Sequence, residues 1–270
     1  MTLTDMKESI FAALSPDFPW KGQVHYLSST GSTNDVLKEL ARQGAPYGTS
    51  VIAGHQTGGH GRMGRSFHSP EGMGIYMSIL LRPKCIPTQL MHLTCAAAAA
   101  MCDAVEKSTG LRPGIKWTND LVFGKRKLGG ILTELGLSPQ GGVDYAIIGI
   151  GINCRQKETD FPEDIRQIAA SLEMVTGKRM DPALLAAAML ESLHRMDDRL
   201  LTEKDTILAD YRKNCITIGK EISVVRGEII RYGQALDVDA EGALIVKYED
   251  GTLETVNSGE VSIRGMYGYV

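Results

Sequence analysis

Residues 54–67 read GHQTGGHGRMGRSF, and the class of fold depends on what this glycine-rich stretch does. Residues 59–64 fit G-x-G-x-x-G, the fingerprint of dinucleotide-binding loops, and residues 59–66 differ by one residue from a phosphate-binding P-loop. Both kinds of loop open directly into a helix whose N-terminus binds the phosphates. The residues that follow here, SFHSPEGMG, contain a proline and two glycines, which disfavour a helix. The sequence therefore argues against both nucleotide-binding folds.

Two arginines distinguish this stretch from an ordinary flexible surface loop, which glycines also produce. Arg62 and Arg65 stand three residues apart among glycines. A flexible backbone with guanidinium groups that bind in bidentate fashion suits a loop that folds over an anionic phosphate. The histidines of the region, at positions 55, 60 and 68, match no zinc-binding spacing, so no metal site is predicted in the protein itself.

The composition is that of an ordinary globular protein with reduced cysteines. The chain has 270 residues, 43% hydrophobic and 23% charged, which allows one large and one small domain. A formal net charge of −3 argues against DNA as the main ligand, because duplex binding depends on neutralising phosphates. Five scattered cysteines without C-x-x-C, no secretory signal and no long apolar run predict a cytoplasmic protein that does not enter a membrane.

Hydrophobic periodicity and turn residues predict three regions along the chain. Residues 1–22 form an N-terminal extension with one short helix, and residues 23–214 form a large domain of mixed helices and strands. From Cys215 onward short strands alternate with turns, so residues 215–270 are predicted to form a small β-barrel. In the large domain we expect strands at 24–27, 49–53, 73–82, 113–117, 127–137 and 145–153, and helices at 35–44, 87–110, 163–175, 183–200 and 203–213.

Two further motifs lie downstream of the glycine-rich stretch. Residues 116–120 read KWTND and are followed by RKLGGIL at 126–132, while residues 149–153 read GIGIN. A charged hairpin turn explains Lys125 well, since turns often carry lysines, but it explains less well why Lys127 leads straight into an apolar strand. For GIGIN the simpler interpretation is a core strand that ends in a polar residue.

In this order the motifs resemble those of biotin protein ligases. The resemblance runs from Ser28 to Asn153 and rests on Ser-Thr-Asn at a helix start, QTGGHGRMGRSF, KWTND, RKLGGIL and GIGIN. It implies an α+β fold related to class II tRNA synthetases, with a mixed, largely antiparallel sheet and flanking helices. The β-rich tail is similar to the family's small C-terminal SH3-like β-barrel. A catalytic region that starts near residue 23 is expected to belong to the short form, without the N-terminal DNA-binding domain of some members.

The resemblance implies a two-step ligase reaction. Biotin and ATP form biotinyl-5′-AMP and pyrophosphate with Mg²⁺ on the phosphates, and a lysine of a biotin carboxyl carrier protein, such as an acetyl-CoA carboxylase subunit, then takes the biotin. No DNA partner is expected, and a homodimer is compatible with the sequence. Two alternatives stay open, namely a related acyl ligase such as a lipoate ligase and a non-catalytic adapter that binds through its barrel. A site that hydrogen-bonds biotin's ureido ring should reject lipoate, whose dithiolane has no N–H.

The resemblance also assigns site residues. The cations that offset repulsion between a carboxylate and a polyphosphate, with the acidic residue of KWTND, are expected to be catalytic: Lys127, Arg62, Arg65 and Asp120. The expected biotin site consists of Ser32, Thr33, Asn34, Gln56, Gly59, His60, Arg62, Tyr76, Lys127, Gly130 and Leu132. The expected ATP site consists of Arg62, Arg65, Phe67, Lys116, Asn119, Asp120, Lys127 and Asn153. Ser32 and Thr33 are also explained as a helix cap, and Tyr76 and Leu132 as core residues.

Five positions depart from the family's usual pattern. His60 and Met63 stand where the loop usually carries arginines, and Phe67 stands where a tryptophan usually follows. Thr118 replaces the proline of the usual KWPND, and Gly129 replaces the alanine of the usual RKLAG. The loss of two cations is expected to weaken retention of the adenylate, while the two arginines of the loop and the lysine of RKLGGIL keep the chemistry.

Overall fold

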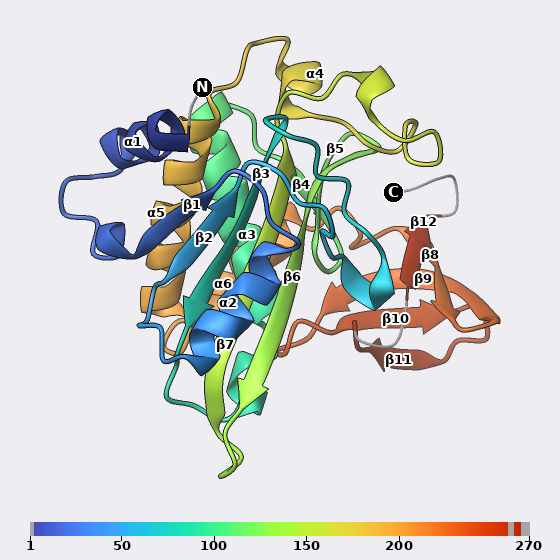
Figure 1. The fold of residues 1–270 in the computed structure, drawn as a ribbon. Helices are drawn as coiled ribbons and strands as arrows, with labels where there is room; N and C mark the ends of the chain where they lie inside the picture. Colours follow the sequence, from blue (N-terminus) through green and yellow to red (C-terminus); the bar gives the residue numbers. More distant parts are fainter. Residues whose placement is uncertain (1–2, 259–261, 266–270) are drawn as a thin grey trace.

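Seven strands between residues 24 and 153 form the larger of two sheets in the computed structural model, which describes residues 3–258 and 262–265 (Figure 1). β1 and β2 run parallel, and the other neighbouring pairs in the order β1-β2-β3-β7-β6-β5-β4 are antiparallel. The prediction of an α+β fold with a mixed, largely antiparallel sheet is confirmed. The strands are β1 (Val24–Leu27), β2 (Ser50–Ala53), β3 (Gly74–Leu81), β4 (Gly114–Lys116), β5 (Asp120–Phe123), β6 (Arg126–Leu137) and β7 (Val143–Asn153).

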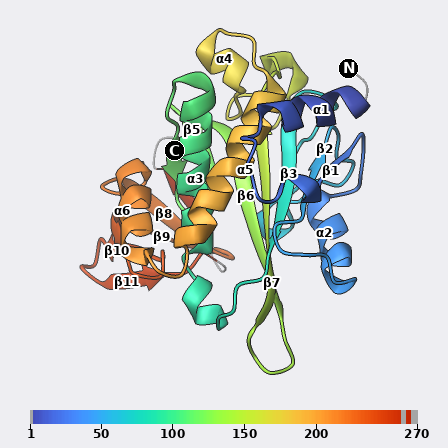
Figure 2. The same cartoon turned by 90° about the vertical axis from the view of Figure 1, so that its left-hand side faces the viewer.

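Helices cover both faces of this sheet (Figure 2). The helices are α1 (Leu3–Ala13), α2 (Thr33–Arg42), α3 (Leu93–Thr109), α4 (Leu172–Thr176), α5 (Pro182–Arg199) and α6 (Lys204–Asn214). α2 packs across β2, β3 and β7 on one face, while α3 and α5 pack against β6 and β3 on the other. α1 packs on α5, where Ile10 and Leu14 are buried. Among the described residues, no helix has the length and apolar character needed to cross a bilayer.

The two faces of β3 differ in what they pack against. Ile79 lies in the main core, whereas Leu80 lies in a smaller core with Leu37 of α2. Since side chains alternate along a strand, Ser78 shares the α2 face with Leu80. Across the ladder Ser78 pairs with Gly149 of β7. The apolar contacts under α2 therefore give way to small and polar groups, which pack against the first turn of the helix.

The second sheet has five antiparallel strands and lies at the β4 edge of the first (Figure 1). Its strands are β8 (Glu221–Arg226), β9 (Ile229–Val238), β10 (Leu244–Tyr248), β11 (Leu253–Val256) and β12 (Ser262–Gly265). The buried Trp117 joins the two sheets, because its backbone N–H donates to Thr217 Oγ1 and its indole N–H donates to the Gly242 carbonyl, both at 2.9 Å. Residues 259–261 and 266–270 of the predicted barrel lie outside the described residues.

The helix predicted at 163–175 is wrong. Only Leu172–Thr176 is helical; residues 163–168 form turns instead, and Ala169 forms a bridge to Lys127 of β6. The Lys127 N–H donates to the Ile168 carbonyl at 2.7 Å, and the Ala170 N–H donates to the Lys127 carbonyl at 2.8 Å. These bonds satisfy backbone groups that a helix would have paired internally. The segment can therefore turn its apolar side chains toward a cavity beside β6.

Candidate active site

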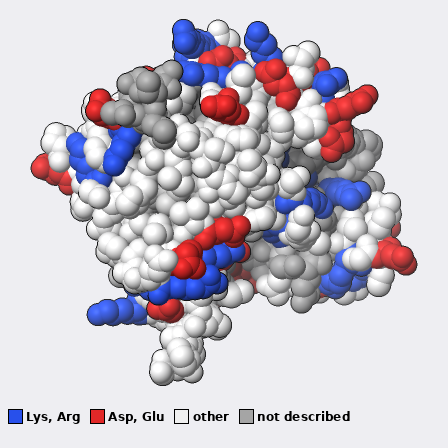
Figure 3. Space-filling model, viewed as in Figure 1, with Lys and Arg blue, Asp and Glu red and all other residues white. Residues whose placement is uncertain are grey.

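A cavity of about 260 Å³ lies between α2, the glycine-rich loop, β4–β7 and β12. Figure 3 shows Lys and Arg atoms gathered in a hollow of the face in view, with other charged side chains nearer its edges. We call one part of the lining the polar side, which consists of Ser32, Thr33 and Gln56. We call another part the cationic side, which consists of Arg62, Arg65, Lys116 and Lys127.

The polar side presents hydroxyl and amide groups without a charge. Ser32 occupies the N-cap position of α2 and is buried, yet its side chain makes no capping hydrogen bond. The backbone N–H and the hydroxyl of Thr33 both donate to Gln56 Oε1, at 2.9 and 3.1 Å, and Gln56 Nε2 donates to Ser69 Oγ at 3.1 Å. Because buried polar groups are normally paired, a buried hydroxyl that does not cap its own helix is suited to a polar ligand.

Asn34 fixes the first turn of α2 against the sheet. Its Nδ2 donates to Glu134 Oε2 at 2.7 Å, and Ser78 Oγ donates to its Oδ1 at 2.5 Å. Gly149 lies directly beneath, and a Cβ added there would overlap Asn34 Oδ1. Glycine at 149 is therefore required for the close approach of α2 to β7.

We expect Gly149→Ala to lower the free energy of unfolding by about 1–3 kcal/mol, because the new methyl group must displace Asn34 from its hydrogen bonds. Urea denaturation of the wild type and the variant measures the difference. Gly22→Ala is the control, since nothing lies within 4 Å of a Cβ added there, and it should change stability by less than about 0.5 kcal/mol. Equal stability of the two variants would mean that Asn34 moves aside without cost.

Arg62 joins the cationic side to the C-terminal domain. Its Nη1 donates to Asn119 Oδ1 at 3.0 Å, and its Nη2 donates to the Ser258 carbonyl. Asn119 is oriented in turn, because its Nδ2 donates to the Ile131 carbonyl at 2.9 Å. Burial lowers the pKa of Arg62, but a guanidinium still carries its charge at neutral pH. Groups from the β4–β5 turn and from the segment after β11 thus hold this cation at the cavity.

The two lysines of the cationic side differ in their surroundings. Lys127 Nζ on β6 lies 2.5 Å from Asp120 Oδ1 on the neighbouring β5. Lys116 is 8% exposed, and burial lowers its pKa to about 8 against the opposing effect of Asp120. The positive charges of Lys127, Arg65 and Arg264 lower the pKa of Lys116 further. An anion in the cavity would offset this repulsion, so the cationic side is suited to a phosphate or carboxylate.

The glycine-rich loop is a short hairpin. The Phe67 N–H donates to the Gly59 carbonyl at 2.9 Å, which closes the hairpin at its base. At its tip, Met63 and Gly64 have φ angles of 56° and 72°, as in the tight turns that favour glycine. The chain then reaches β3 without an intervening helix, so neither the dinucleotide nor the P-loop interpretation holds.

Comparison with known proteins agrees with this geometry. Residues 26–153 match the model of the biotin/lipoate A/B protein ligase family, and residues 217–264 match that of the biotin protein ligase C terminal domain. The chain is 35% identical over 239 residues to the bifunctional ligase/repressor BirA of Bacillus spizizenii, which covers 88% of this chain and 73% of that protein. The chain belongs to the biotin protein ligase family.

Other members of the biotin protein ligase family match along nearly their whole length. The chain is 31% identical over 248 residues to the biotin–[acetyl-CoA-carboxylase] ligase of Mycobacterium tuberculosis, which covers 90% of this chain and 89% of that protein. It also resembles the structure of the biotin protein ligase from Aquifex aeolicus in complex with biotin and ATP, with a TM-score of 0.76 and 29% identity over 90% of this chain and 99% of that one.

Most of the site residues predicted for this biotin ligase line the cavity: Ser32, Thr33, Asn34, Gln56, His60, Arg62, Arg65, Phe67, Lys116, Asn119, Asp120, Lys127, Gly130 and Asn153. Three others do not. Gly59 is buried at the base of the hairpin, where an added Cβ would come within 2.7 Å of the Phe67 carbonyl. Tyr76 is fully buried against the ring of Phe67, and its hydroxyl donates to the Pro70 carbonyl at 3.0 Å. Leu132 lies on β6 outside the lining.

An apolar wall of the cavity was not predicted from the sequence. It consists of Phe161, Ile165, Ile168 and Ala169 from the segment before α4, with Ile263 of β12. Asn153 supports this segment, because its Nδ2 donates to the Ala170 carbonyl at 3.1 Å. The cavity of the biotin ligase thus has an apolar part in addition to its polar and cationic sides.

No group of three or more His, Cys, Asp or Glu side chains in residues 3–258 and 262–265 is arranged to hold a metal ion. The five cysteines are free thiols, as predicted for a reduced protein. Magnesium is usually held by one or two carboxylates together with substrate phosphates rather than by a protein cage. Asp120 lines the cavity beside the cationic side and fits a magnesium ion that arrives with a nucleotide.

Proposed function

We propose that this chain forms biotinyl-5′-AMP from biotin and ATP and then transfers biotin to a lysine of a biotin carboxyl carrier protein. The observation that carries the proposal is one cavity with an uncharged hydrogen-bonding side, a cationic side and an apolar wall. Biotin and ATP together need all three. The relatives support the same conclusion, since one structure contains biotin and ATP and one relative is named for acetyl-CoA carboxylase.

The polar side suits the ureido ring of biotin. The ring has two N–H donors and one carbonyl acceptor, and each loses water when the ring is buried. Ser32 and Thr33 offer hydroxyl groups, and Gln56 offers an amide that Ser69 already orients. Gly149 of β7 lines the cavity beside these groups.

The cationic side suits the first chemical step. An oxygen of the biotin carboxylate attacks the α-phosphorus of ATP, and the bond from that phosphorus to the leaving pyrophosphate breaks. Both reactants are anions, so fixed positive charges reduce their repulsion and stabilise the charge of the transition state. Arg62 and Lys127 are held in position by Asn119 and Asp120. When bound beside Asp120, Mg²⁺ would neutralise phosphate charge.

The apolar wall suits the adenine base. Phe67 lies over β7, because a Cβ added at Gly151 would overlap its ring. Phe161 and Ile165 line the same cavity, so a flat base is assigned to the space that these side chains border. Asn153 already bonds the Ala170 carbonyl, and we therefore assign it to holding the wall rather than to the base.

The second step needs little from the protein. The carrier lysine attacks the acyl carbon of the adenylate, its amine loses a proton, and AMP leaves. The mixed anhydride is already activated, so a strong general base is not required. Asp120 is paired with Lys127 at 2.5 Å, and we assign it to positioning that lysine and binding magnesium.

Biotin-dependent pyrophosphate–ATP exchange with purified protein and Mg²⁺ tests the first step, and biotin transfer to a purified carrier domain tests the second. Exchange that requires biotin, followed by labelling of the carrier lysine, would support both. Exchange without labelling would restrict the proposal to adenylate formation. No exchange with biotin, in protein that remains folded, would rule the proposal out and favour a binding role.

ATP binding should weaken as the pH rises above about 8, where the empty protein loses the charge of Lys116. A bound polyphosphate favours the charged amine, so binding above this pH takes up a proton and Kd rises by at most about tenfold per pH unit. Below pH 8 the amine is already charged and Kd should be flat. Calorimetric titration between pH 7 and about 9.5 measures this. Lys116→Met should bind ATP more weakly at pH 7 and should show no such rise; the same rise in the variant would assign it to another group.

A further inference from the structure

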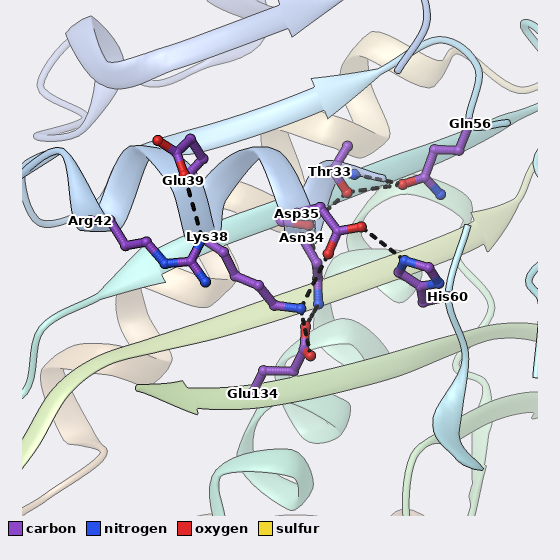
Figure 4. Close-up of polar contacts among 10 residues, drawn as sticks. Thr33, Asn34, Asp35, Lys38, Glu39, Arg42, Gln56, His60 and Glu134 are labelled. Carbon is purple, nitrogen blue, oxygen red and sulfur yellow. Dashed lines mark hydrogen bonds and ion pairs between the residues drawn. The ribbon is translucent and has the colours of Figure 1, made fainter. Parts of the chain in front are cut away.

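His60 joins the glycine hairpin to the first turn of α2 (Figure 4). Its Nε2 lies 2.9 Å from Asp35 Oδ2, and the other carboxylate oxygen of Asp35 accepts from Lys38 Nζ at 3.2 Å. Lys38 Nζ also lies 2.8 Å from Glu134 Oε1 on β6. A chain of polar contacts thus connects the hairpin through α2 to the central sheet. His60 lines the cavity, whereas Asp35, Lys38 and Glu134 lie outside its lining.

The carboxylate of Asp35 is ionised in this arrangement. Burial alone would raise its pKa, but the hydrogen bonds from His60 and Lys38 outweigh that effect and lower it. A negative charge in the first turn of a helix is also favourable, because the helix dipole is positive there. Asp35 is therefore a fixed acceptor, and Lys38 orients it.

The first turn of α2 holds the chain on both sides of residues 57–59. Before them, Gln56 accepts from Thr33, and after them His60 meets Asp35. Arg62 follows two residues after His60, and its guanidinium reaches the cavity only while the hairpin lies against the domain. A contact at His60 therefore affects how often the hairpin, together with Arg62, moves away from the cavity.

We propose that His60 and Asp35 form a clasp that keeps the glycine hairpin closed and slows release of the acyl-adenylate. Both are positioning residues, because His60 acts through the hairpin and Asp35 acts through His60. The role in retaining the adenylate rests on the function proposed above, whereas the clasp itself does not. The two side chains are 50% and 53% exposed, and contacts between exposed groups are weak, so opening should rise about two- to fivefold when the clasp is removed.

Tryptic cleavage after Arg62 in the folded, ligand-free protein measures opening, because this arginine must leave Asn119 and the Ser258 carbonyl to enter a protease. His60→Ala should raise the cleavage rate about two- to fivefold. In an Asp35→Ala background the same change should have no further effect, since the partner is already absent. Arg42→Ala is the matched control, because Arg42 pairs with Glu39 on the same helix and touches no member of the clasp (Figure 4).

Two amide variants separate a hydrogen bond from mere bulk. The amide nitrogen of His60→Gln lies near the position of Nε2 and should restore slow cleavage, whereas His60→Asn is too short and should behave as His60→Ala. Equal cleavage of both amide variants, or additive effects of His60→Ala and Asp35→Ala, would overturn the clasp.

Release of labelled biotinyl-adenylate from the enzyme tests the functional half of the proposal. The release rate should rise about two- to fivefold in His60→Ala, while the rate of adenylate formation in a single turnover changes less, and His60→Gln should restore retention. If His60→Ala is cleaved faster by trypsin but releases the adenylate at the wild-type rate, the clasp exists but does not retain the adenylate. If no adenylate forms from biotin, the proposed function fails while the cleavage result for the clasp still stands.

Discussion

The protein is expected to select biotin over lipoate by about 10⁴-fold in kcat/KM for adenylation. Ser32 and Thr33 are buried and Gln56 is partly buried, and a dithiolane ring offers no N–H or carbonyl group to these hydroxyl and amide groups. Pyrophosphate–ATP exchange driven by each acid measures the ratio. Comparable rates with the two acids would contradict the assignment of the polar side to a ureido ring.

Thr33→Val tests the same point from the side of the protein. The hydroxyl of Thr33 donates to Gln56 Oε1 at 3.1 Å and lies 2.6 Å from Ser78 Oγ, so its loss removes a polar group of the cavity lining with little change in volume. We expect kcat/KM for biotin to fall by about 10–100-fold while that for lipoate does not fall. Thr57→Val is the control, because Thr57 is exposed and lies outside the cavity lining. Equal losses for both acids would indicate a disturbed α2 rather than a lost hydrogen bond.

The local parts of this fold are predictable from the sequence. Period-two alternation places Ile79 and Leu80 on opposite faces of β3, and a proline with two glycines after the hairpin removes the helix that a nucleotide loop needs. Glycines in a strand permit close approach of other groups, and Gly149 and Gly151 of GIGIN do so beneath Asn34 and Phe67. Each of these inferences depends only on residues near in sequence.

The apolar wall depends on contacts that the sequence does not encode locally. A helix was predicted at 163–175, a range that contains Ile165 and Ile168 of this wall. The segment forms turns instead, Ile168 and Ala170 bond Lys127 of β6, and the apolar side chains line a cavity. Hydrophobic periodicity alone shows which residues share a face of an element. It does not show whether that face packs against a core or lines a cavity.

Local sequence patterns also did not predict which residues of the C-terminal region reach the cavity. Ile263 lines the cavity, the charge of Arg264 lowers the pKa of Lys116, and the Ser258 carbonyl accepts a hydrogen bond from Arg62. All three depend on how one sheet docks on the other through Trp117. Tyr76 is a further example. Period-two alternation predicts which face of β3 carries its side chain, but it does not predict that Phe67 covers this side chain.

Lys127→Ala is expected to slow biotin-dependent pyrophosphate–ATP exchange by about 10²–10³-fold. The change removes a cation that lines the cavity, and it also leaves the carboxylate of Asp120 without its partner at 2.5 Å. That carboxylate then repels the phosphates, so part of the loss arises from a new negative charge. Lys125→Ala is the control, since Lys125 lies two residues away in an exposed turn and should retain wild-type exchange.

The two contributions can be separated with Asp120→Asn. Alone, this variant should slow exchange less than Lys127→Ala does, because the cation remains although it is held less firmly. Combined with Lys127→Ala, it should restore part of the lost rate, since the unpaired charge is gone. A double variant slower than Lys127→Ala would mean that the loss of magnesium binding at Asp120 outweighs the removal of its unpaired charge. Wild-type exchange in Lys127→Ala would instead remove Lys127 from the catalytic step and leave Arg62, Arg65 and Lys116 as the cations of the cavity.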